Sequence, residues 1–173
     1  MQKLWRSEGP GTNDLRLLKS CGKNVIVEDG VRIFHPENIE LGDNIYLGHD
    51  TILKGYYNSV ISIGSNTWIG QQCFIHGAGG VEIGENVGIG PGVKIHAAKH
   101  KELGTDIPIL FSGLEYARII IGSDCNIGIG AVILPGVNIG RGSKIGANAV
   151  VNKNIPEFSV AVGVSAKVIK SRI

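Results

Sequence analysis

Four of the five histidines lie at positions 35, 76, 96 and 100, and Lys54 stands among them. Histidine is the side chain best suited to exchange protons near neutral pH, because its ordinary pKa is about 6.5. A histidine beside a hydroxyl or an amine can take its proton and so act as a general base. What these side chains can do together depends on whether the fold brings them to one place.

The fold is indicated by an aliphatic residue followed by glycine, which recurs every six residues along most of the chain. A fixed short period indicates one structural unit that is copied and stacked. The residue four positions after each aliphatic residue is small or β-branched, which favours short strands with two inward side chains per face. An amphipathic helix would need a period near 3.6, so the repeat region cannot be helical. The aliphatic positions form groups of three, namely 21, 27, 33; 41, 47, 53; 63, 69, 75; 83, 89, 95; 121, 127, 133; and 139, 145, 151.

Every insertion falls between the third position of one group and the first position of the next. The sequence therefore predicts an all-β protein, a parallel β-helix of about six triangular coils in which all insertions leave from one corner. At about 4.8 Å per coil, this column would be about 29 Å tall. We expect an N-terminal cap segment at 1–20, including a short helix near 14–18, a β-helix domain at 21–156 and a C-terminal cap or tail at 157–173.

The longest insertion, residues 96–120, is where we expect the chemistry, because a long loop in a repeat array usually carries a site. It begins with two histidines and contains an apolar stretch at 107–111, which should pack on its own column or on a neighbouring subunit. Lys54, His76 and His96 occupy the same repeat position on three successive coils. These three side chains should stack beside the corner that the loop leaves, so we regard them as candidate substrate-binding residues.

His100 is the leading candidate for a general base, and the alternative is an ordinary exposed loop histidine. His96 could carry a second proton, bind an acceptor or lie in solvent at the bend. His35 lies two coils below His76 and is expected to be structural.

Composition limits the class of protein. With 43% hydrophobic residues and 26 glycines, 173 residues suit one β-helical domain better than a disordered chain. No apolar run is long enough for a membrane span, and the N-terminus lacks the apolar core of a signal peptide, so we expect a soluble, cytoplasmic protein. A net charge of +2 with scattered lysines does not suggest a nucleic-acid partner. The cysteines at 21, 73 and 125 form no CxxC pair and should point into the column, and no metal is expected.

Two stretches carry a resemblance to a known family, IGIGAVILPGVNIGRGSKIGANAVVNKNIP at 127–156 and VAVGVSAKVIK at 160–170. Together with the histidine-bearing loop, they make residues 60–170 similar to the left-handed β-helix, or hexapeptide-repeat, acyltransferases. Within that family the chain resembles sugar O-acetyltransferases such as maltose and galactoside acetyltransferases and polysaccharide-modifying relatives. The resemblance implies a left-handed column and a homotrimer whose active sites lie between subunits. It also implies that acetyl-CoA lies in the groove between columns.

The resemblance further implies roles for single residues. In the family an I-x-x-x-x-H segment opens the long loop and its histidine is the base, which here selects His100. Many relatives carry a second histidine two residues earlier, where this chain has Ala98. The residues that would contact acetyl-CoA are Gly128, Ile129, Ala147, Asn152, Lys153 and Lys167.

The sequence thus predicts direct transfer of an acetyl group from acetyl-CoA to a sugar hydroxyl of a saccharide or polysaccharide precursor. His100 would be the base, and a backbone N–H near Gly128 would stabilise the oxyanion. The first alternative is N-acetylation of a nucleotide-linked amino sugar. More distant alternatives are a zinc enzyme similar to γ-class carbonic anhydrases, with ligands His76, His96 and His100, and a non-catalytic β-helix assembly protein.

Overall fold

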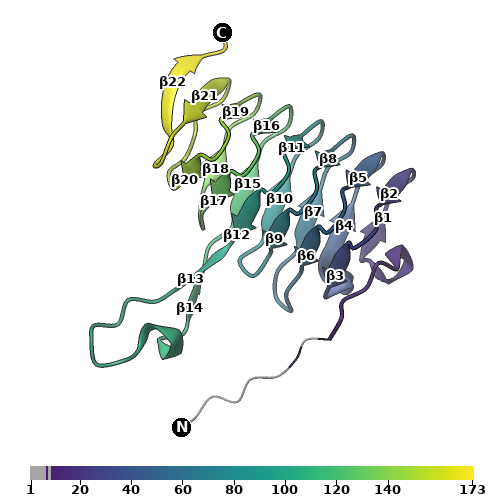
Figure 1. The fold of residues 1–173 in the computed structure, drawn as a ribbon, viewed down its shortest axis with the longest axis horizontal. Helices are drawn as coiled ribbons and strands as arrows, with labels where there is room; N and C mark the ends of the chain where they lie inside the picture. The colour runs from purple at the N-terminus through teal and green to yellow at the C-terminus, as the bar shows by residue number, and fades with distance from the viewer. Residues whose placement is uncertain (1–6, 8) are drawn as a thin grey trace.

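The computed structural model describes residue 7 and residues 9–173, and in this part of the chain almost all regular structure is β. Short strands wind into a column of stacked coils (Figure 1). The helical elements described are three single turns of 3₁₀ helix, η1 (Leu15–Leu17), η2 (Pro36–Asn38) and η3 (Ile109–Phe111). The all-β fold class predicted from the six-residue period is therefore confirmed.

Three sheets form the faces of the column, and their strands pair in parallel except for β22. The first face consists of β1 (Ser20–Cys21), β4 (Ile39–Leu41), β7 (Ile61–Ile63), β10 (Val81–Ile83), β15 (Ile119–Ile121) and β18 (Asn138–Ile139). The second face consists of β2 (Val25–Val27), β5 (Ile45–Leu47), β8 (Trp68–Ile69), β11 (Gly88–Ile89), β16 (Asn126–Ile127), β19 (Lys144–Ile145), β21 (Ser159–Val162) and β22 (Lys167–Ser171). The third face consists of β3 (Arg32–Phe34), β6 (Ile52–Lys54), β9 (Phe74–His76), β12 (Lys94–His96), β17 (Val132–Ile133) and β20 (Val150–Val151). Six coils are complete, β21 begins a seventh, and the arrangement is that of the left-handed parallel β-helix.

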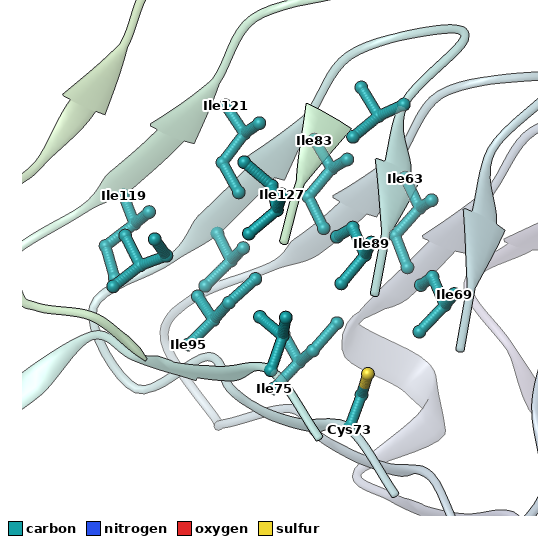
Figure 2. Close-up of a cluster of buried hydrophobic side chains, with 14 of the residues drawn as sticks. Ile63, Ile69, Cys73, Ile75, Ile83, Ile89, Ile95, Ile119, Ile121 and Ile127 are labelled. Carbon is teal, nitrogen blue, oxygen red and sulfur yellow. The ribbon is translucent and has the colours of Figure 1, made fainter. Parts of the chain in front are cut away.

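The core contains the aliphatic positions of the repeat, stacked in rows along the column (Figure 2). Each row repeats one register position, so an isoleucine on one coil packs against isoleucines on the coils before and after it. Burying one such side chain stabilises the fold by about 1.5–3 kcal/mol. The rows drawn in Figure 2 include Ile63, Ile83 and Ile121 from the first face, Ile69, Ile89 and Ile127 from the second, and Ile75 and Ile95 from the third.

The corner between the first and second faces is held by a row of amides. Asn24, Asn44 and Asn66 all have φ between 56° and 59°, a left-handed conformation that asparagine tolerates better than most residues. The Asn24 amide donates to Asn44 at 2.7 Å, and the Asn44 amide donates to Asn66 at 3.0 Å. The row continues with Asn86, which donates to Asp124 at 3.1 Å. Together with Arg141, that hydrogen bond holds the pKa of the Asp124 carboxyl below its usual value.

The expected burial of the cysteines holds for two of the three. Cys73 and Cys125 are buried in the column, and burial raises the pKa of both thiols. The prediction for Cys21 is wrong, because this residue is exposed. It lies on β1, the first strand of its sheet, so a neighbouring coil covers it on one side only.

The two ends of the column differ. At the N-terminal end, Asp14 caps η1, and Leu15 and Leu18 pack against the core; residues 1–6 and 8 of the expected cap lie outside the described part. At the C-terminal end, β22 runs antiparallel to β21 and is exposed along its length.

The long insertion projects from the column as a hairpin (Figure 1). Its strands are β13 (Ala98–His100) and β14 (Leu114–Tyr116), which pair antiparallel. The apolar side chains at its tip are exposed instead of packing on their own column; they are Leu103, Ile107, Ile109, Leu110 and Phe111. Within the described residues, no helix has the length and apolar character needed to cross a membrane.

Glycines at the bends allow the coils to approach closely, and this can be tested at Gly48. A Cβ atom there would lie 2.7 Å from the backbone nitrogen of Gln71, so Gly48→Ala must push two coils apart. We expect a loss of about 2 kcal/mol, which lowers Tm by about 4–8 °C in thermal unfolding followed by circular dichroism. At Gly88 a Cβ would meet only the side chain of Asn126, so Gly88→Ala is the matched control and should leave Tm nearly unchanged. Equal losses in both variants would contradict this account.

Candidate active site

The predicted row of polar side chains on the third face is present. Lys54 is the register partner of His76, and His76 is the register partner of His96. The two imidazole rings stack with their centroids 4.3 Å apart and their planes 17° from parallel. His76 is only 8% exposed, so the row lines the inner part of the corner between the third and first faces. We call this the insertion corner.

Two tyrosines that the sequence analysis did not single out lie at the same corner, and one of them contacts the row. Tyr56 follows Lys54 in the insertion of coil two, and its hydroxyl lies 3.1 Å from Nε2 of His76. The Lys54 Nζ lies 5.5 Å from the centroid of the Tyr56 ring, within the range of a cation–π contact. The Tyr57 ring makes an edge contact with the His35 ring, and their centroids are 4.5 Å apart. The signal that could have found them was the position of this insertion, which leaves from the same corner as the long loop.

A backbone contact fixes the hydrogen position on His96. Its Nδ1 lies 2.6 Å from the carbonyl oxygen of Ala98. Since a carbonyl oxygen can only accept, Nδ1 carries a hydrogen, and in the neutral ring the lone pair is on Nε2. His96 can therefore bind a hydroxyl or accept a proton through Nε2 alone.

His100 lies at the end of β13, where it pairs with Leu114 of β14. It is half-buried, and its Nδ1 is buried without a hydrogen-bond partner among the described residues. The hairpin that carries it is held by Ser112, whose hydroxyl donates to the carbonyl of Lys101 at 2.6 Å and can also reach that of Ile109 at 2.8 Å.

The predicted acetyl-CoA contacts Gly128, Ile129 and Ala147 lie at a different corner, between the second and third faces, which we call the second corner. The Gly128 N–H donates to the carbonyl of Ile145 at 2.9 Å, so it cannot also stabilise an oxyanion. Among the backbone hydrogen bonds of the described residues, the amides of Ile129 and Ala147 are not donors. Ile129 is 55% exposed, and its amide is a better candidate than that of Gly128 for stabilising the oxyanion.

The other predicted acetyl-CoA contacts are divided between the corners. Lys167 begins β22 and pairs with Val162, at the C-terminal end of the second corner. Asn152 and Lys153 follow β20 on the third face and lie near the insertion corner, and the Asn152 amide donates to the Ser165 hydroxyl at 2.9 Å. One chain therefore does not gather all six residues into one place.

The width of the third face separates the two corners. On coil four this face runs from Pro91 to His96, a step of five residues, and at about 3.3 Å per residue it is about 16 Å wide. The hairpin with His100 then extends away from the column (Figure 1). No group of three or more histidine, cysteine, aspartate or glutamate side chains within the described residues is placed to hold a metal ion.

Comparisons with known proteins agree with this architecture. Residues 118–153 match the family model of the bacterial transferase hexapeptide (six repeats), and residues 60–97 match that of the hexapeptide repeat of succinyl-transferase. YJL218W of Saccharomyces cerevisiae, described as an acetyltransferase, is 38% identical over 155 residues, which cover 89% of this chain and 66% of that protein. WcaF of Escherichia coli, described as a colanic acid biosynthesis acetyltransferase, is 29% identical over 88% of this chain and 69% of its own length.

Among solved structures, AntD, an N-acyltransferase from Bacillus cereus in complex with dTDP and 3-hydroxybutyryl-CoA, superposes with a TM-score of 0.80. It is 27% identical, and the alignment covers 91% of this chain and 85% of that one. The chain belongs to the hexapeptide-repeat acetyltransferase family. It spans 66% of the yeast relative and 39% of Rv3034c, a Mycobacterium tuberculosis protein described as an acetyltransferase.

The hold of Ser112 on the hairpin can be tested by hydrogen exchange. Ser112→Ala removes the bond to the Lys101 carbonyl, which is worth about 1 kcal/mol. We expect amides in residues 101–113 to exchange about fivefold faster while the strands of the column keep their protection. Ser171→Ala, on the exposed strand β22, is the control. Unchanged exchange in 101–113 would show that other contacts hold the hairpin.

Proposed function

We propose that this protein transfers an acetyl group from acetyl-CoA directly to a sugar hydroxyl, with His100 as the general base. The observation that supports this most strongly is the place of His100, on the first strand of the projecting hairpin and four residues after His96, the last histidine of the polar row. The acceptor oxygen attacks the thioester carbonyl while His100 takes the hydroxyl proton. The C–S bond then breaks, and the thiolate of CoA leaves and recovers that proton. A base of this kind contributes about 10²–10⁴-fold to the rate.

The second corner fits the acyl donor. Successive coils present two backbone amides, from Ile129 and Ala147, that can donate to the pantetheine arm or to the thioester oxygen. The exposed Ile129 side chain offers an apolar contact, and Lys167 lies at the C-terminal end of the same corner, where it can neutralise phosphate.

We further propose that the active site forms between copies of this chain in a homotrimer. The insertion corner of one copy would face the second corner of the next copy, which removes the separation of about 16 Å within one chain. The exposed apolar tip of the hairpin supports such an assembly, because an exposed patch of this kind usually marks an interface.

A second candidate function is N-acylation of a nucleotide-linked amino sugar. It is favoured by the similarity to AntD and by the Escherichia coli dTDP-4-amino-4,6-dideoxy-D-glucose acyltransferase, which is 28% identical over 89% of this chain and 82% of its own length. A neutral amine is already nucleophilic, whereas a hydroxyl needs the base at the moment of attack. The two functions therefore differ in how strongly they depend on His100.

His100→Ala tests the base. We expect kcat with a hydroxyl acceptor to fall about 10²–10⁴-fold while CoA affinity stays nearly unchanged, since CoA would bind at the other corner. Turnover is measured by release of the CoA thiol and affinity by thermal shift, in which ligand at about 100 times its Kd stabilises by about 2.7 kcal/mol. His49→Ala is the control, because His49 is exposed, lies outside the insertion corner, and is three coils away from Ile129 along the second corner. Full activity of His100→Ala would refute the assignment.

The shared site predicts complementation between two inactive variants. Ile129→Glu places a carboxylate where the anionic donor would bind, so it should inactivate the second corner, and His100→Ala inactivates the insertion corner. When the two variants are co-expressed, about a quarter of the interfaces in random mixed trimers join two intact corners. Activity should therefore return to about a quarter of the wild-type value. If mixed trimers, verified by two affinity tags, stay inactive, the site does not lie between subunits.

A further inference from the structure

The insertion corner contains a small cleft with aromatic walls. It has a volume of about 310 Å³, and its lining includes Tyr57 and Tyr116 together with Asn58 and Ser59. Tyr57 is 76% exposed and Tyr116 is 55% exposed, so both rings present open faces. Tyr116 pairs with Ala98 on β13, the strand that ends at His100, so the cleft and the proposed base share one hairpin.

Tight packing fixes the shape of this cleft. A Cβ atom on Gly79 would lie 2.4 Å from the carbonyl oxygen of Ala97 and 2.6 Å from the nitrogen of Ala117, so the base of the hairpin rests directly on Gly79. The Ser59 hydroxyl donates to the carbonyl of Gly77 and joins the insertion of coil two to coil three. The cleft is therefore a built feature between three neighbouring segments.

The chemistry of the cleft suits a sugar ring. No charged side chain lines it, so the pyrophosphate of a nucleotide would lack a cationic partner there. Aromatic rings accept the C–H face of a sugar, and the Asn58 amide and the tyrosine hydroxyls can bond its hydroxyl groups.

A second hollow continues from the cleft across the first face. This trough has a volume of about 640 Å³ and shares Asn58, Ser59 and Gly79 with the cleft. Its floor includes Ser62, which lies in register between Glu40 and Glu82.

Ion pairs border the trough on both sides. Glu40 pairs with Lys19 at 2.9 Å, and Glu82 pairs with Arg118. Within the described structure, no large hydrophobic side chain on the first-face strands is exposed, unlike at the hairpin tip. The trough thus has carboxylate acceptors and cationic donors on either side of a small residue. Such a polar surface suits the hydroxyl groups of a saccharide better than the surface of a protein partner.

We propose that the cleft and the trough together bind an acceptor saccharide of more than one ring. One ring lies between Tyr57 and Tyr116, close enough to His100 to receive the acetyl group, and the next rings lie along the trough toward Glu40 and Lys19. This inference rests on the proposed function and narrows its acceptor to an oligosaccharide or glycan chain, in place of a single sugar linked to a nucleotide.

The test compares acceptors of increasing length. The probes are the methyl glycosides of glucose, galactose, mannose and N-acetylglucosamine, linear oligosaccharides of each up to the tetrasaccharide, and dTDP-4-amino-4,6-dideoxyglucose. Each probe is incubated with acetyl-CoA and the protein. We expect kcat/KM to rise with chain length for at least one series. Arg118→Gln should lower kcat/KM about tenfold for the tetrasaccharide, by loss of hydrogen bonds, and leave the monosaccharide within about twofold. Tyr57→Ala should lower both about tenfold.

Arg141→Gln is the matched control, because Arg141 is 63% exposed and paired with Asp124, as Arg118 is 61% exposed and paired with Glu82. It should leave all values unchanged. Three outcomes would refute the binding of saccharide rings in the trough while leaving acetyl transfer intact. They are equal kcat/KM at all lengths, equal effects of the two arginine variants, and a preference for the nucleotide sugar. Failure of every probe to accept acetyl, with CoA still bound in thermal shift, would instead refute the proposed function together with the inference.

Discussion

The in-register stacking of parallel coils is the constraint on which the rest of this structure depends. Each coil lies about 4.8 Å from the next, so side chains at the same repeat position are forced into rows. Rows of isoleucine make the core, and a row of asparagines with left-handed backbone holds one corner. The same rule places Lys54 beside His76 and His76 beside His96, because each pair occupies one repeat position on neighbouring coils.

A row of side chains stays at its own corner along the whole column. The groups that acyl transfer would need to combine are therefore kept at different corners. The proton-exchanging side chains lie at the insertion corner, and the amides suited to the acyl donor lie across the third face at the second corner. A rigid prism cannot bend to close this distance. Under the proposed function, several columns would have to assemble to build one site, and the exposed apolar tip of the hairpin would provide a surface for this.

Much of this could be predicted from the sequence, because a six-residue period is a local pattern that determines which side chains point inward. The coils, the core rows and the Lys54–His76–His96 row all follow from it. The prediction failed for Cys21 because β1 is the edge strand of its sheet among the described residues, so only one neighbouring strand covers it. Tyr56, Tyr57 and Tyr116 were missed because insertions have no register. Their positions depend on close contacts such as that of Gly79 with Ala97, which no spacing reveals.

The antiparallel strand β22 has a consequence for how the protein behaves at high concentration. A column of identical parallel coils could grow without limit by adding the first coil of another molecule to its last one. On the second face, β22 reverses the strand direction, contains a register shift opposite Val160 and Ala161, and carries Lys167 and Lys170. An incoming parallel strand would find mismatched hydrogen-bonding groups and positive charge there, so the chain contains its own barrier to end-to-end fibre formation.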